Sequence, residues 1–333
     1  MSGSLKIGIP RALLYYYYIP LWRTFFEALG LEVVISRPTT KTILESGLRH
    51  TGDDVCLPVR VAFGHIIDLK DRVDVLFLPR LVSIARREYV CPKFLGFPDM
   101  VRQGISGLPP LIEADLNLYR RDSLYPFFSA LGRNFTSNRF AIYLACRRAQ
   151  QVQARYVQLL EKGFFPEEAL AISYRGASEE KREPARGWPR VAVIGHPYNI
   201  YDPYISMNLL SRLARSGVHV CTADNLPETL VREHAARLPK HLFWSLGQRM
   251  IGATWHYLQR PDVDGIIHVA SFACGPDSLT GELISREVKR RGKPFLNLTL
   301  DEHSAEAGVV TRLEAFLDMM RRRPLLQVGG NGR

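Results

Sequence analysis

Three of the five cysteines in this chain are followed by proline, either directly or after one intervening residue. The three sequences are Cys56-Leu-Pro, Cys91-Pro and Cys274-Gly-Pro. Proline removes a backbone donor and stiffens the loop around it, which suits a side chain that must be held in place for a ligand. A thiol in such a loop could be a nucleophile, a ligand of a metal or cluster, or a small buried apolar side chain.

Cys274 lies where a predicted buried strand is followed by a predicted helix. Residues 265–272 are apolar and β-prone, and Asp277 or Ser278 is expected to cap a helix over 278–291. Free backbone N–H groups and the helix dipole at such a position favour a thiolate. Cys56 precedes a proline in the first turn of another predicted helix, which gives it a similar setting.

The other two cysteines, Cys146 and Cys221, have the setting of small buried side chains. Cys146 has core spacing on a predicted helix, and Cys221 ends a predicted buried strand. An odd number of cysteines without an export signal argues against a disulfide framework. Because the sequence has no CxxC pair, any metal site must gather its cysteines from distant segments.

Two kinds of metal site are compatible with Cys56, Cys91 and Cys274. Three thiolates could bind zinc together with a histidine such as His65 or His268, although the lack of a compact ligand pair disfavours structural zinc. Alternatively, they could hold a [4Fe–4S] cluster and leave one iron without a protein thiolate. That iron would be open to substrate or sulfide, so the cluster could do chemistry as well as carry electrons.

Two polar residues near these cysteines are candidate site residues in the first third of the chain. His65 follows Cys56 by nine residues and could donate to a cluster sulfur or carry a proton. A partly buried structural histidine is the alternative. Lys93 stands beside Cys91 and could offset the negative charge of a thiolate-ligated cluster, with an exposed lysine as the alternative.

Two further groups follow strands that should end at the same sheet edge as Cys274. His196 and Tyr198 follow a strand over 191–195 and are candidate pocket residues, with turn formation as the alternative. Glu302 and His303 follow a strand over 294–300 and could form an acid–base group. For this second group, the alternative is a loop that begins the final helix.

The elements that must position these residues alternate between strands and helices. Strands are expected at 5–10, 31–36, 73–79, 191–195, 218–222, 265–271 and 294–300, and a helix is expected over 203–216. This alternation predicts an α/β protein with two doubly wound parallel-sheet domains facing a cleft. The expected parts are a first α/β domain at 1–105, a helical connecting segment with a linker at 106–188, a second α/β domain at 189–325 and a disordered tail at 326–333. Similar openings, KIGIPRALLYYYY and VAVIGHPYNIYDPY, indicate two copies of one architecture.

Composition and charge restrict the class of protein. The chain is 46% hydrophobic and 23% charged, as in an ordinary soluble protein. No apolar run approaches the ~18 residues of a membrane span and no signal peptide is recognisable, which predicts a cytoplasmic location without a membrane partner. The net charge is +11, but the basic residues are dispersed and no nucleic-acid motif accompanies them, so we expect no nucleic-acid partner.

Five stretches together resemble one known family. They are IGIPRALLYYYYIPLWRTFFEALGLEVVIS, DDVCLPVRVAFGHIIDLKDRVDVLFLPRLVS, YVCPKFLGFPDM, SFACGPDSLTGELI and LTLDEHSAEAGVVTRLEAF. In these stretches the chain is similar to proteins related to the activators of 2-hydroxyacyl-CoA dehydratases, also called CoA-protein activases. That domain occurs alone or appended to an ATP-dependent activator, and it is a relative of the dehydratase subunits.

The resemblance implies a fold, a cofactor and a partner. It implies doubly wound domains with an iron–sulfur cluster between them, held by Cys56, Cys91 and Cys274. Relatives hold either a [4Fe–4S] cluster or a sulfide-bridged double-cubane cluster, and they receive low-potential electrons from a dimeric iron–sulfur activator that hydrolyses ATP. The dehydratases form a ketyl radical from a 2-hydroxyacyl-CoA, and double-cubane relatives reduce small molecules.

The chain departs from the better-understood relatives in two respects. A double cubane needs six cysteines, and only three fit here, so such a cluster would require a second chain and hence a homodimer. The sequence also lacks a Walker A pattern, so ATP hydrolysis would belong to a partner. We therefore expect an oxygen-sensitive iron–sulfur protein for low-potential electron transfer or reductive activation, with an acyl-CoA or small-molecule substrate.

Two other classes of protein remain open on the sequence. One is a non-catalytic module that binds a CoA-type ligand or a partner and has structural cysteines. The other is a zinc-dependent hydrolase. Iron, sulfide and zinc contents of the purified protein distinguish all three.

Overall fold

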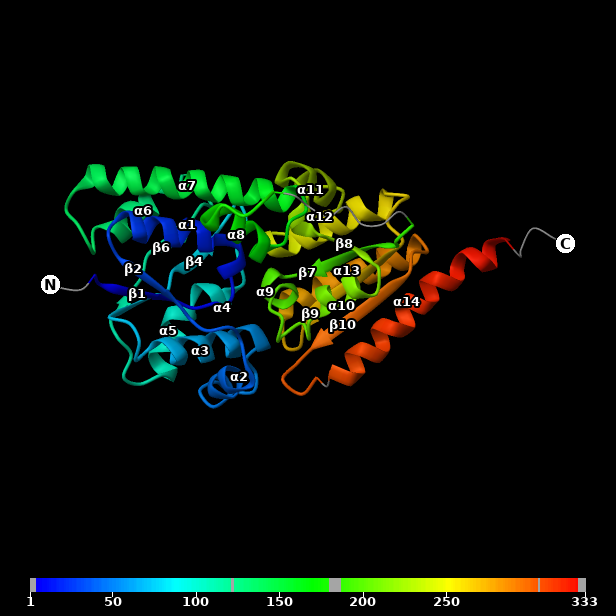
Figure 1. Cartoon of the computed structure of the whole chain (residues 1–333), viewed down its shortest axis with the longest axis horizontal. Helices are drawn as coiled ribbons and strands as arrows, with labels where there is room; N and C mark the ends of the chain where they lie inside the picture. Colours follow the sequence, from blue (N-terminus) through cyan, green and yellow to red (C-terminus); the bar gives the residue numbers. More distant parts are fainter. Residues whose placement is uncertain (1–3, 121–122, 180–186, 305, 329–333) are drawn as a thin grey trace. The chain divides into compact units, whose positions relative to one another are not determined.

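The chain forms two compact units, each of which is described by itself (Figure 1). The computed structural model describes residues 4–120, 123–179, 187–304 and 306–328. Unit 1 comprises Met1–Glu180 with Leu242–Leu246, and unit 2 comprises Lys181–His241 with Gly247–Arg333. Both units are α/β with parallel sheets, which confirms the predicted fold class.

Unit 1 is built on a four-stranded parallel sheet in the order β2-β1-β3-β5. The strands of this sheet are β1 (Lys6–Ile9), β2 (Glu32–Ile35), β3 (Val75–Phe77) and β5 (Leu111–Ile112). A separate parallel pair is formed by β4 (Arg80–Ser83) and β6 (Asp115–Asn117). The sequence did not predict β4, β5 or β6, which have only two to four residues each.

Helices cover both faces of the unit 1 sheet (Figure 1). They are α1 (Tyr15–Ala28), α2 (Lys41–Leu48), α3 (Leu57–Leu69), α4 (Pro92–Leu95), α5 (Phe97–Gly104), α6 (Tyr125–Gly132), α7 (Arg139–Glu161) and α8 (Pro166–Arg175). Figure 1 shows α1, α6 and α7 on one side and α2, α3 and α5 on the other. The buried hydroxyl of Tyr156, on α7, donates to the carbonyl of Tyr16, on α1, at 2.7 Å, so this helix of the segment predicted over 106–188 packs against α1.

Unit 2 repeats the same sheet with different helices. Its strands are β7 (Arg190–Gly195), β8 (His219–Thr222), β9 (Gly265–Ser271) and β10 (Phe295–Leu300), all parallel, in the order β8-β7-β9-β10. Its helices are α9 (Pro197–Ile200), α10 (Leu209–Arg215), the 3₁₀ helix η1 (Ala223–Asn225), α11 (Glu228–Ala235), α12 (Ser245–Gln259), α13 (Gly275–Arg290) and α14 (Glu306–Val328). Every residue of β9 is buried, as expected for a central parallel strand.

The two four-stranded sheets have the same topology. In each unit, the first strand in the chain lies between the second and the third, and the fourth lies at the edge beside the third. The connections therefore change direction between the first and third strands, which is where open parallel sheets bind ligands, at the carboxyl ends of the strands. These positions are the ends of β1 and β3 in unit 1 and of β7 and β9 in unit 2. The expectation of two copies of one architecture is met by the sheets.

Some expected boundaries in unit 2 differ from the observed ones. A helix was expected over 203–216, but α10 begins only at Leu209. The carboxylate of Asp202 accepts hydrogen bonds from the amides of Tyr204 and Ile205 and so forms a turn there. The last helix continues to Val328, three residues into the tail expected to be disordered, and 329–333 lie outside the described residues. Residues 180–186 of the expected linker also lie outside them.

No helix in residues 4–120, 123–179, 187–304 and 306–328 is both long and apolar enough to cross a bilayer.

Candidate functional site

Two loops at the switch point of unit 2 carry the candidate residues. His196 directly follows β7 and is the residue before the short helix α9. Cys274 follows β9 by three residues and is the N-cap residue of α13, with Pro276 in the first turn. Ala273 has a left-handed backbone (φ 60°), which turns the chain sharply between the strand and the cysteine.

These loops bring together a thiol, an imidazole and a carboxylate. One ligand atom from each of His196, Cys274 and Asp277 lies within 4.8 Å of the other two. Nε2 of His196 is 2.7 Å from Oδ1 of Asp277. His196 and Asp277 are 3% and 1% exposed, and Cys274 is 9% exposed, so little water reaches the group.

Neighbouring polar residues fix the two loops relative to each other within unit 2. The backbone N–H of Ser271 donates to Oδ2 of Asp277 at 3.3 Å. The hydroxyl of Ser271 donates to Oδ1 of Asn199, on α9, at 2.8 Å. The ring of Tyr198 lies 5.0 Å from the ring of His196, which places Tyr198 beside the group as well.

Electrostatics keeps the carboxylate of Asp277 charged. Burial by itself would raise the pKa of Asp277, but the charge of the nearby His196 ring and the amide of Ser271 oppose it and hold the pKa below its ordinary value. Burial lowers the pKa of His268, a buried residue of β9, so its ring is neutral at pH 7. The group at the switch point therefore carries an ionised carboxylate in a buried setting.

The role of Asp277 differs from the expected one. Asp277 or Ser278 was expected to cap the helix, but Cys274 is the N-cap residue and α13 begins at Gly275. The carboxylate of Asp277 contacts His196 and Ser271 instead. The spacing of three residues between Cys274 and Asp277 is the signal in the sequence, because residues i and i+3 share one side of a helix.

The other two Cys-Pro loops lie in unit 1 and have the same local geometry. Cys56 is the N-cap residue of α3, and Cys91 is the N-cap residue of α4. In both cases, as at Cys274, a proline occupies the first or second helical position and the side chain makes no capping hydrogen bond. Nζ of Lys93 donates to the carbonyl of Asp54 at 3.2 Å, which connects the Cys91 helix to the Cys56 loop.

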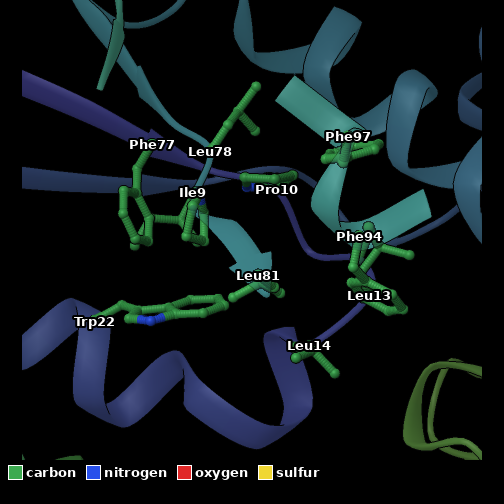
Figure 2. Close-up of a pocket in the computed structure, with 12 residues that line it drawn as sticks. Ile9, Pro10, Leu13, Leu14, Trp22, Phe77, Leu78, Leu81, Phe94 and Phe97 are labelled. Atoms are coloured by element: carbon green, nitrogen blue, oxygen red, sulfur yellow. The ribbon is translucent and has the colours of Figure 1, made fainter. Parts of the chain in front are cut away.

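A small apolar cavity lies at the switch point of unit 1 (Figure 2). Its volume is about 30 Å³, and residues at the ends of β1 and β3 line it together with Phe94 and Phe97. Figure 2 shows Phe94, on the short helix α4 whose N-cap residue is Cys91, facing Leu13. The residues that line it are apolar, so the cavity suits an apolar group.

His65 has a buried position on α3. Its ring nitrogens lie 2.9 Å from the Ser36 hydroxyl and 3.0 Å from the Thr39 hydroxyl. Burial lowers the pKa of His65 to about 3. Both ring nitrogens are used in holding these two hydroxyls, an arrangement that favours a structural role over the predicted catalytic one.

The loop after β10 holds Glu302 and His303 at the edge strand of the sheet. Nε2 of His303 is 3.8 Å from the Glu302 carboxylate, and the His303 side chain is 88% exposed. Asp301 accepts hydrogen bonds from the amide of His303 and the hydroxyl of Ser304, which forms a turn before α14. The structure places these residues in the loop between β10, the neighbour of β9 in the sheet, and the final helix α14.

Cys146 and Cys221 are buried, as expected for small core side chains. Burial raises the pKa of the Cys146 thiol to about 11, so this thiol is protonated at neutral pH. Both residues serve as controls for the three Cys-Pro sites.

The fold and the site thus define a parallel α/β protein with paired sheets and a Cys/His/Asp group at one switch point. A model of the family described as the CoA enzyme activase uncharacterised domain (DUF2229) matches residues 6–226. A model of the 2-hydroxyglutaryl-CoA dehydratase D-component matches residues 153–320. The chain belongs to this family of CoA enzyme activase and 2-hydroxyacyl-CoA dehydratase-related proteins, as its sequence stretches indicated. A search of curated proteins found no match.

Proposed function

We propose that this protein is an iron–sulfur protein for low-potential electron transfer or reductive activation of a CoA thioester. In this proposal, Cys56, Cys91 and Cys274 ligate one [4Fe–4S] cluster. The observation that carries it is the shared geometry of the three cysteines, each an N-cap residue followed by a proline in the first turn of its helix. Thiolates are the usual protein ligands of such clusters, and the local stiffness of the three loops suits ligands that must stay in place.

The residues around the cysteines have supporting roles in this proposal. Lys93 holds the Cys56 loop through the carbonyl of Asp54, and its charge would offset part of the negative charge of the ligated cluster. His196 lies beside Cys274, and Tyr198 packs against the ring of His196. Both would orient the group bound there and exclude solvent from it. When bound, the cluster would supply one-electron chemistry at low potential.

A partner would supply the electrons. The sequence has no Walker A pattern, so we infer that an ATP-hydrolysing activator delivers them. The two matching families are named for CoA enzyme activation and for 2-hydroxyglutaryl-CoA dehydration, which supports a CoA thioester as the substrate class.

Anaerobic purification tests the cluster. We expect about four iron atoms and four sulfides per chain after reconstitution, with the absorbance and EPR signal of a [4Fe–4S] cluster. Alanine at Cys56, Cys91 or Cys274 should remove most of the iron, whereas Cys146→Ala and Cys221→Ala should retain it. Absence of iron from the wild-type protein, or equal losses in all five variants, would contradict the proposal.

A second candidate is a non-catalytic binding module for a CoA-type ligand. The apolar cavity at the unit 1 switch point favours it, since small apolar groups bind in such places. Calorimetric titration of iron-free protein with an acyl-CoA and with free CoA distinguishes this candidate. Binding that survives replacement of all three Cys-Pro cysteines would support it.

A further inference from the structure

The Cys/His/Asp group of unit 2 has the composition of a site for a single metal ion. Cys274, His196 and Asp277 offer a sulfur, a nitrogen and an oxygen, all within 4.8 Å of one another. In tetrahedral zinc sites, bond lengths of 2.0–2.3 Å place the ligand atoms about 3.3–3.8 Å apart. The observed group therefore needs adjustments of about 1 Å or less to surround one ion.

Nε2 of His196 and Oδ1 of Asp277 form a close, buried pair of possible ligand atoms. Nε2 and Oδ1 are only 2.7 Å apart, but Oδ1 has no aligned hydrogen-bond donor among the described residues. Asp277 is 1% exposed, so no bulk water satisfies this oxygen. A buried carboxylate oxygen without such a donor can serve as a ligand for an ion.

The second layer of the group supports ligand roles. Oδ2 of Asp277 is held by the amide of Ser271, which leaves Oδ1 for an ion. Ser271 is itself held by its hydrogen bond to Asn199. Outer hydrogen bonds of this kind orient the ligands of metal sites and strengthen binding. Sulfur, imidazole nitrogen and carboxylate oxygen are all ligands that divalent transition-metal ions accept.

We propose that Cys274, His196 and Asp277 bind one divalent transition-metal ion, such as Zn²⁺ or Fe²⁺, within unit 2. Three protein ligands leave a fourth position for water or another small ligand, as in catalytic rather than structural zinc sites. This site goes beyond the proposed cluster because it needs neither Cys56 nor Cys91. Cys274 is a ligand in both proposals. The single ion and the cluster are therefore alternatives that cannot be bound by the same Cys274 at once.

Titration of the anaerobic, metal-free full-length protein with Co²⁺ tests the site. Co²⁺ takes the place of zinc and reports its ligands through its absorption spectrum. We expect one equivalent to bind tightly, with a sulfur-to-cobalt charge-transfer band and the intense visible bands of a four-coordinate ion. Zn²⁺ should displace it.

Variants separate this site from the cluster. Cys274→Ser should abolish the charge-transfer band, and His196→Gln and Asp277→Asn, which preserve side-chain size, should each weaken Co²⁺ binding at least tenfold. Cys56→Ala and Cys91→Ala should bind Co²⁺ as the wild type does while failing to assemble the cluster. His234→Gln is the matched control for a buried histidine of the same unit, and it should leave Co²⁺ binding unchanged.

The outcomes distinguish the two proposals. Co²⁺ binding that is unaffected by His196→Gln and Asp277→Asn, in variants whose circular dichroism shows them to be folded, would overturn the site. Loss of the cobalt bands in Cys56→Ala and Cys91→Ala would also overturn it, because the ion would then sit with the cluster ligands. Normal cobalt binding in a protein that never assembles a cluster would support the single-ion site and would contradict only the cluster proposal.

Discussion

The buried ring of His65 makes stability depend on pH. Because burial lowers the pKa of His65 from its ordinary value of 6.5 to about 3, the ring is neutral in the folded protein and protonated in the unfolded chain between these values. The unfolded state then binds more protons, so stability is full above pH 6.5 and falls as the pH decreases toward 3. The loss from this residue should be about 2 kcal/mol between pH 7 and pH 5.

Urea unfolding of the wild type and of His65→Gln at these two pH values measures this effect. Glutamine cannot titrate and can keep a hydrogen bond to Ser36 or Thr39. The variant should be less stable than the wild type at pH 7, and its stability should change about 2 kcal/mol less between the two pH values. The same pH dependence in both proteins would show that His65 does not titrate as described.

At the unit 2 switch point, the sequence predicts which residues lie at the strand ends but not which side chains contact each other. Cys274 and His196 could be predicted as neighbours because each lies within three residues of the end of a buried strand, and parallel strands end at one edge. The partner of His196 could not be predicted in the same way. An aspartate in the first turn of a helix is most often a cap, and only the approach of another loop turns its carboxylate toward an imidazole.

At the scale of elements, local signals predicted more than long-range ones did. The helix starts at Cys56 and Cys274 follow from the proline in the first turn, which is a local effect. The strands β4, β5 and β6 were missed because two to four residues carry no clear alternation, and pairing with a distant strand defines them. The expected helix over 203–216 was too long because the Asp202 turn competes with it.

The contact between α2 and α3 requires glycine. A Cβ atom at Gly64, on α3, would lie 1.9 Å from the carbonyl oxygen of Ile43, on α2, and one at Gly47 would lie 1.9 Å from the carbonyl oxygen of Arg60. The two helices therefore cross with backbone against backbone. Gly64→Ala should force them apart and cost about 3 kcal/mol, which lowers the melting temperature of unit 1 by roughly 10 °C.

Gly308→Ala is the control for this substitution. Gly308 lies in α14, has an ordinary helical backbone and has nothing within 4 Å of an added Cβ. Alanine there should change the melting temperature by less than about 2 °C, with a slight increase expected. Since α3 begins at Cys56, Gly64→Ala should also reduce the iron that the protein retains. A Gly64→Ala protein as stable as the wild type would disprove the close crossing.

At the scale of the whole molecule, the two family models overlap across the division between the units. The first model covers most of unit 1 and continues through β7 and β8, and the second begins within α7 of unit 1 and covers all four strands of unit 2. Both units share one strand order. The apolar cavity of unit 1 and the Cys/His/Asp group of unit 2 lie at the equivalent switch point of their own sheets. The proposed cluster ligands are divided between the units, with Cys56 and Cys91 in unit 1 and Cys274 in unit 2.

This division predicts that a bound cluster couples the stabilities of the units. A ligand that binds only the folded state stabilises whatever holds it, so one cluster with ligands from both units should protect both. Hydrogen exchange of the α3 amides, in unit 1, should be slower in the cluster-loaded protein than in the metal-free protein. Cys274→Ser, made in unit 2, should return the α3 amides to the metal-free rate although it changes nothing in unit 1.

Cys221→Ser provides the comparison, since this buried residue lies in unit 2 and is not a proposed ligand. It should leave the exchange of α3 slow in the cluster-loaded protein, whatever it does to β8 itself. If Cys274→Ser leaves the protection of α3 intact while Cys56→Ala removes it, the cluster is held by unit 1 alone. Cys274 would then be free to serve only the single-ion site, and the cobalt titration of the same variants decides whether it does.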